Sequence, residues 1–176
     1  MIAKLITNII LIISLALVQV AFISGLTGWL NNLNLLLVVL LFILGFANLD
    51  LALAWALGLG LALELFSFLP FGAYLASLAL TVVAANFLLD YFFTNRSLYS
   101  FLALTGLATA IYELIIYAMV FILAEISPGE FSPSGDFLAA SFKQIGLNLL
   151  GTLLIFYIIH FLLRNFKPVF LVKNKS

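Results

Sequence analysis

The stretch Gly58-Leu-Gly-Leu-Ala-Leu-Glu-Leu-Phe-Ser-Phe-Leu-Pro-Phe-Gly72 decides how this chain folds. It places a carboxylate, Glu64, near the end of an apolar segment, and Pro70 and Gly72 then interrupt the helix before a second apolar segment begins. Backbone N–H and C=O groups have no water to bond in lipid, so such a break must lie at a membrane surface or be buried in protein. A charge inside an apolar run costs roughly 2.5–3.5 kcal/mol at the centre of a membrane helix and less near its end. We therefore expect Glu64 either to contact a partner or cavity, or to reach interfacial water.

The composition of the whole chain indicates an all-α integral membrane protein. Its 176 residues are 66% hydrophobic and 8% charged, whereas a soluble domain carries about 25% charged residues. The formal net charge of zero argues against nucleic-acid binding, which needs a basic face, and the absence of Cys excludes disulfides and cysteine-ligated metals. Hydrolase, P-loop and zinc-protease motifs are also missing. We therefore expect neither enzymatic activity nor a cofactor.

The hydropathy pattern predicts a single polytopic domain over residues 1–176, folded as a compact bundle of about six spans. The predicted spans cover residues 5–24, 35–47, 51–68, 73–93, 98–125 and 142–163. The second is short for a crossing and would need tilt or a thinner bilayer. With six spans, Lys4, Arg96 and the basic tail at 164–175 share one side, which the positive-inside rule makes cytoplasmic. Both termini are then cytoplasmic, and the loop at 126–140 faces outward.

Small side chains recur at every fourth position on both sides of the corner. The third predicted span carries Ala52, Ala56 and Gly60, with Gly58 beside them, and the fourth carries Ala73, Ser77, Thr81 and Ala85. Because lipid tails are as apolar as Leu, membrane helices associate through close backbone approach and buried polar contacts. We therefore predict that these two spans form an antiparallel hairpin packed along the small residues.

A second carboxylate, Glu113, lies near the middle of the fifth predicted span, with Tyr117 one turn beyond it. No Lys or Arg lies at a matching depth in another predicted span, so we expect Glu113 either to be protonated and hydrogen-bonded or to face a polar cavity. Its candidate partners are Tyr, Asn148 or Ser. The functional alternative is a proton relay or cation site. The structural alternative is a neutral carboxyl group that donates a hydrogen bond to another helix. Asp90 and Arg96 are interpreted as anchors at the membrane boundary.

The run Gly60-Leu-Ala-Leu-Glu-Leu-Phe-Ser67, followed after two residues by Pro70-Phe-Gly72, resembles a motif of the rod shape-determining MreD family. Members of that family carry Gly-Leu-Leu-Leu-Asp-Leu-Leu-Ser, then Pro-Leu-Gly and another apolar helix. Glu64 stands where the family has Asp, which keeps the charge and lengthens the side chain. The resemblance is specific over about residues 35–90 and concerns only the architecture elsewhere.

The resemblance implies a non-enzymatic subunit of the cell-elongation complex in the bacterial cytoplasmic membrane. Such a subunit would bind an MreC-like scaffold and, through it, the cell-wall synthases, with an MreB-like filament inside the cell. The corner residues Glu64, Ser67, Pro70 and Gly72 would then be the first candidates for partner contacts. The basic tail at 164–175 suits anionic lipid headgroups or a cytoplasmic partner.

The family's fold is also similar to the substrate-binding subunits of energy-coupling-factor vitamin transporters. This similarity supplies a rival prediction, a subunit that captures a small molecule from outside the cell. Such a site needs a cavity with a few convergent polar groups. The outer half of the predicted bundle offers Glu64, Asn31, Asn32, Asn34 and Gln144, in addition to Glu113.

Overall fold

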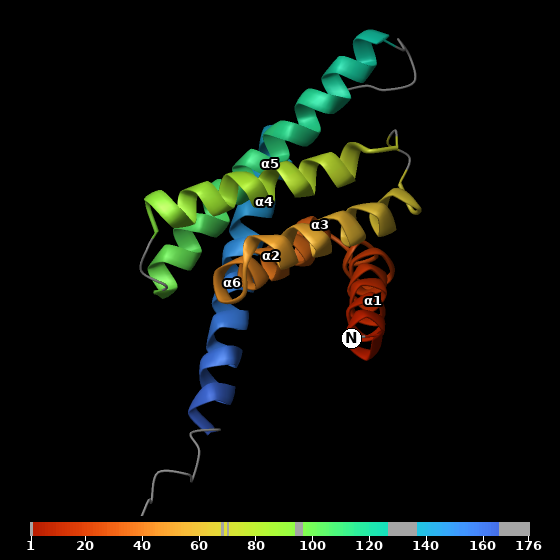
Figure 1. The fold of residues 1–176 in the computed structure, drawn as a ribbon. Helices are drawn as coiled ribbons and strands as arrows, with labels where there is room; N and C mark the ends of the chain where they lie inside the picture. Colours follow the sequence, from red (N-terminus) through yellow and green to blue (C-terminus); the bar gives the residue numbers. More distant parts are fainter. Residues whose placement is uncertain (1, 68, 70, 94–96, 127–136, 166–176) are drawn as a thin grey trace, which may run out of the picture.

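The computed structural model describes residues 2–67, 69, 71–93, 97–126 and 137–165, and every regular element among them is helical (Figure 1). The helices are α1 (Ile2–Leu17), its π-helical continuation η1 (Val18–Ile23), the short 3-10 helix η2 (Leu30–Asn32), α2 (Leu35–Phe46), α3 (Leu49–Glu64), α4 (Ala73–Tyr91), α5 (Leu98–Ile126) and α6 (Phe137–Asn165). The predicted all-α class is therefore confirmed.

The helices do not form a simple parallel bundle. α3 and α4 run alongside each other, α5 packs on α4, and α6 packs on α5, with α5 and α6 oblique to the pair (Figure 1). α1 packs against the other side of α3, where Ile12 lies beside Gly58. Successive helices from α2 to α6 reverse direction, so the end of α3, the start of α4 and the start of α6 lie at one end of the molecule.

The short helix α2 forms the centre of the fold. Its core side chains, fully buried, are Leu36, Leu37, Val38, Leu40 and Leu41. α2 contacts α3, α4, α5 and α6, and the ring of Phe42 stacks on Phe101 of α5 with centroids 5.0 Å apart. Twelve residues extend only about 18 Å at 1.5 Å per residue, which is less than the roughly 30 Å of a hydrocarbon core. α2 is thus too short to span the hydrocarbon core without tilt or thinning, and the helices that it contacts cover its buried side chains.

Four helical segments of the described residues are long and apolar enough to cross a membrane. They are Ile6–Ile23, Ala73–Tyr91, Leu98–Ile122 and Leu138–Phe161. α2 and α3 are shorter, with 12 and 16 residues. The fold is thus compatible with a multi-pass membrane protein, and the count of six spans stays a prediction.

Two helix limits differ from the predicted boundaries. α3 ends at Glu64, before the end of the third predicted span at about residue 68, and the extent of that span stays a prediction. The predicted outer loop was drawn to residue 140, but α6 already begins at Phe137. The run Phe-Leu-Ala-Ala contains neither Gly nor Pro, so it can form the first turn of α6. Residues 127–136 lie outside the described part of the chain.

The hairpin of α3 and α4 packs along small side chains, as predicted. The buried members are Ala52, Ala56, Gly60, Ala73, Ser77, Thr81 and Ala85. The two backbones approach closely at Gly60, where an added Cβ would lie 2.6 Å from the Cα of Leu75. Gly58 serves a different interface, because an added Cβ there would meet the side chain of Ile12 at 3.0 Å.

Candidate functional site

The carboxylate of Glu64 caps the neighbouring helix. Its Oε1 accepts hydrogen bonds from the backbone N–H groups of Tyr74 (2.8 Å) and Leu75 (3.1 Å). These are the second and third residues of α4, whose own N-cap residue is Gly72 and so offers no side chain. Amide groups in the first turn of a helix lack intrahelical partners and carry a partial positive charge, which a carboxylate satisfies. Glu64 is only 8% exposed, so the interpretation that it reaches interfacial water was wrong.

The other corner residues shape the backbone around this cap. Gly72 has φ of +100°, a left-handed conformation that residues with a Cβ rarely adopt. The Ser67 hydroxyl oxygen accepts a hydrogen bond from the backbone N–H of Leu69 at 2.8 Å. Pro70 lies outside the described residues. Three apolar side chains at the corner, which together form its tip, are exposed: Leu65, Phe66 and Phe71, at 79%, 55% and 79%.

Removal of the Glu64 cap is expected to destabilise the hairpin. Glu64→Leu leaves two amide groups of α4 without an acceptor, so we expect the free energy of unfolding to fall by about 1–2 kcal/mol. Glu64→Gln keeps one acceptor oxygen and should lose less than half of that. Thermal unfolding in detergent, followed by circular dichroism, measures both, with Asp90→Asn at the far end of α4 as the unaffected control. Equal stability of Glu64→Leu and the parent chain would contradict the capping role.

A polar pocket of about 230 Å³ lies beside this corner, at the same end of the molecule. Its polar lining consists of Gln19, Ser24, Asn31, Asn32, Asn34, Tyr74, Tyr112, Glu113 and Gln144, with Leu33, Leu63 and Ile116 between them. The structure therefore brings together the predicted residues Asn31, Asn32, Asn34, Glu113 and Gln144. Glu64 is not part of the lining, because its carboxylate is engaged by α4.

Sequence reasoning missed four polar residues of this pocket: Gln19, Ser24, Tyr74 and Tyr112. The available signal for Gln19 was its position as an amide within an apolar run. In the structure the Gln19 side-chain amide makes two hydrogen bonds to the backbone at the start of α2. It donates to the carbonyl of Leu33 and accepts from the N–H of Leu35, each at 2.9 Å. The π-helical turn of η1 contains Gln19, and its side chain thereby ties the end of the first helix to the pocket.

A buried hydrogen-bond network joins the pocket to α5 and α6. The side chain of Asn148, which is fully buried, accepts from the N–H of Asn34 at 2.9 Å and donates to the hydroxyl of Thr109 at 3.0 Å. One turn further along, the hydroxyls of Thr105 and Thr152 lie 2.9 Å apart. Asn34 in turn caps α2 by accepting from the N–H of Leu37. The start of α2 is thus fixed by two helices that come much later in the sequence.

Glu113 occupies a wall between two cavities. One is the polar pocket, and the other is an apolar cavity of about 270 Å³ between α5 and α6. The apolar cavity is lined by Ala110, Leu114, Leu138, Ser141, Phe142 and Ile145 in addition to Glu113. The hydroxyl of Ser141 donates to Oε2 of Glu113 at 3.3 Å. Of the predicted partners, Ser is therefore present, whereas the Asn148 amide is engaged elsewhere. Tyr117 lies one turn beyond, half-buried on α5.

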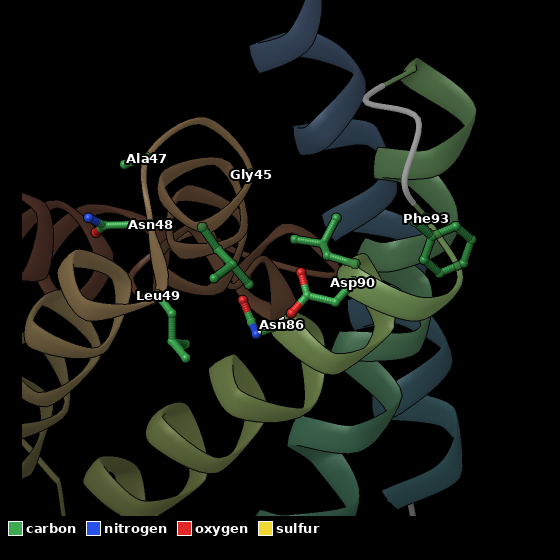
Figure 2. A pocket seen from close by; sticks show the side chains of 9 residues that line it. Gly45, Ala47, Asn48, Leu49, Asn86, Asp90 and Phe93 are labelled. Carbon is green, nitrogen blue, oxygen red and sulfur yellow. Dashed lines mark hydrogen bonds between the residues drawn. The ribbon is translucent and has the colours of Figure 1, made fainter.

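A third cavity, of about 370 Å³, lies at the opposite end of the molecule. It opens where the turn between α2 and α3 meets the end of α4, and Figure 2 shows Asn86 and Asp90 on the same side of it. The Asn86 amide donates to the Asp90 carboxylate at 2.9 Å. Arg96, the other predicted boundary anchor, lies outside the described residues. Within the described part of the chain, no cluster of three or more His, Asp or Glu side chains could hold a metal ion.

The chain was also compared with known proteins. No protein family, no curated protein and no solved structure matches it.

Proposed function

We propose that this chain is a non-enzymatic, six-span subunit of a bacterial cell-elongation complex, of the MreD type, with both termini in the cytoplasm. It would act by docking a membrane-anchored, MreC-like scaffold, and through it the cell-wall synthases. The motif from Gly60 to Gly72 suggests this role. The observation that carries it is the fixed corner between α3 and α4, which presents an exposed apolar tip.

The corner has the physical properties of a docking element. Its backbone is held by the cap from Glu64, by the close packing at Gly60 and by the left-handed Gly72. A surface held in its binding conformation loses less entropy when a partner docks. Its exposed side chains include Phe66 and Phe71, and aromatic residues are enriched in the buried centres of protein interfaces. An apolar partner surface, as a membrane-anchored scaffold offers, fits this tip.

Co-purification tests the docking role. The tagged chain, solubilised gently from its native membrane, should recover a coiled-coil membrane scaffold and cell-wall synthases, identified by mass spectrometry. Leu65→Ser combined with Phe71→Ser removes the two most exposed side chains of the tip, and we expect scaffold recovery to fall by about tenfold or more, as for loss of an interface hot spot. Phe161→Ser, which changes an equally apolar exposed position far along α6, is the control. Undiminished recovery with the corner variant would overturn the docking assignment.

The polar pocket favours a second candidate, a substrate-binding subunit of an energy-coupling-factor type transporter. Its volume of about 230 Å³ is slightly below the range of 300–1,000 Å³ that is usual for ligand pockets, which restricts it to a small molecule. The same co-purification distinguishes the two candidates. Recovery of a transmembrane coupling subunit with ATPases, and release of a small water-soluble molecule on denaturation, would favour the transporter.

A further inference from the structure

We propose that Glu113 marks a binding site for an amphiphile with an ammonium head group. The ammonium group and a neighbouring oxygen-bearing group of the ligand would both occupy the polar pocket. The hydrocarbon tail would lie in the apolar cavity between α5 and α6. This inference goes beyond the docking role, because it uses a different surface and holds whichever complex the corner joins.

The geometry of the two cavities carries the inference. Both are lined by Glu113, so its carboxyl group lies where a polar space and an apolar space meet. The rim of the apolar cavity is formed by Leu114, Leu138 and Phe142, which are 64%, 69% and 72% exposed. The apolar cavity therefore opens on the outer surface of the helices, where lipid tails would lie around a membrane protein. A ligand that spans both spaces must have a polar end and an apolar end.

The charge of the lining selects a cationic head. Glu113 is the acidic residue of both cavities, and neither lining contains Lys, Arg or His. The hydroxyl of Ser141, at 3.3 Å, supplies one donor to Oε2. A carboxylate that is half-buried, as Glu113 is, is stabilised by a counter-charge and by hydrogen bonds, and an ammonium group brings both. An anionic head would instead meet Glu113 with no cation in the lining to compensate for the repulsion.

The unpaired amide of Gln144 indicates a ligand oxygen beside the ammonium group. Its Nε2 is buried and has no hydrogen-bond partner among the described residues. Gln144 lines the polar pocket on α6, one residue beyond the exposed Lys143 and three beyond Ser141. A buried donor without an acceptor is costly, so a hydroxyl, ester or phosphate oxygen placed there would satisfy it. Two sources share this chemistry: a free long-chain amino alcohol and the head group of phosphatidylethanolamine.

Binding experiments with matched probes test the site. The full chain in detergent is titrated with sphinganine, which has an ammonium group, neighbouring hydroxyls and a long tail. Hexadecanol tests the tail without the charge, and ethanolamine tests the head without the tail. Native mass spectrometry of the chain from nanodiscs of phosphatidylethanolamine or phosphatidylglycerol tests the lipid source. We expect sphinganine to bind at least tenfold more tightly than either partial probe, or phosphatidylethanolamine to be retained in preference to phosphatidylglycerol.

Variants separate the site from a general affinity for amphiphiles. Glu113→Gln keeps the shape and removes the charge, and we expect at least tenfold weaker binding of the preferred probe. Leu138→Trp fills the opening of the apolar cavity at an exposed position and should weaken binding to a similar extent. Asp90→Asn removes a carboxylate at the opposite end and should change nothing. Should Glu113→Gln fail to fold, the binding measured with Leu138→Trp still tests whether the ligand occupies the apolar cavity. Unchanged binding in the folded variants, or equal binding of the charged and uncharged probes, overturns the proposal.

Discussion

Replacement of Gly60 by alanine is expected to separate α3 from α4 and to lower the free energy of unfolding by about 1–3 kcal/mol, the usual cost of overpacking a close contact. The added Cβ would lie 2.6 Å from the Cα of Leu75 and 3.1 Å from its backbone nitrogen. Backbone atoms cannot rotate away as a side chain can, so the two helices must move apart. Their separation would also weaken the cap from Glu64, whose carboxylate accepts hydrogen bonds from the backbone N–H groups of Tyr74 and Leu75.

Thermal unfolding in detergent measures this effect. For a chain of this length, each kcal/mol lost from the free energy of unfolding should lower the melting temperature by about 2–4 °C. Two other glycines provide graded controls. At Gly106 the nearest atom to an added Cβ is a side-chain carbon of Leu149 at 4.0 Å, so Gly106→Ala should leave stability unchanged. At Gly58 the neighbour is the flexible end of Ile12 at 3.0 Å, and the effect should be intermediate. Equal melting temperatures for the Gly60 and Gly106 variants would refute the close approach.

The second large effect is expected at Asn148. Asn148→Leu has a similar volume but removes the acceptor for the N–H of Asn34 and the donor to the hydroxyl of Thr109. The N–H of Asn34 is then left without a partner, which costs about 1–3 kcal/mol for a buried group, whereas the hydroxyl of Thr109 keeps its hydrogen bond to the carbonyl of Thr105 at 2.7 Å. Asn34 also caps α2, so the change should loosen the start of the central helix as well.

The neighbouring pair of threonines provides the matched comparison. Thr152→Val removes one hydroxyl contact, but Thr105 keeps its hydrogen bond to the carbonyl of Phe101 at 2.8 Å. The stability loss should therefore be clearly smaller than for Asn148→Leu. Amide hydrogen exchange in α2 adds a local readout, because protection at Leu37 and Val38 should fall in the Asn148 variant and persist in the Thr152 variant. The same loss of protection in both variants would argue against a special role for Asn148.

The hairpin of α3 and α4 could be predicted from the sequence because helical periodicity fixes which residues share a face. Small side chains at every fourth position, such as Ala52 and Ala56, lie on one line of the helix surface. The role of Glu64 could not be predicted in this way. The two N–H groups that donate to its carboxylate lie ten and eleven residues away across a corner, and no repeat in the sequence relates an acid to the amides of a different helix.

The polar pocket was partly predictable for a different reason. In a chain this apolar, each amide such as Asn34 or Gln144 stands out, whereas Tyr112 also suits a membrane boundary and gave no distinct signal. The burial of α2 was beyond sequence reasoning. Because lipid is as apolar as a protein core, a run of Leu and Val reads the same whether it faces lipid or other helices.

The position of α2 at the centre of the fold sets the order of events during biosynthesis. The N–H of Asn34 is bound by Asn148, which is 114 residues further along the chain. At about 5–20 residues per second, α2 is made roughly 6–23 s before that partner exists. The nascent protein must therefore hold α2 in a provisional position until α6 emerges. A ribosome that stalls before α6 leaves this helix without its binding partner, and the truncated product becomes a substrate for the proteases that remove incompletely folded chains.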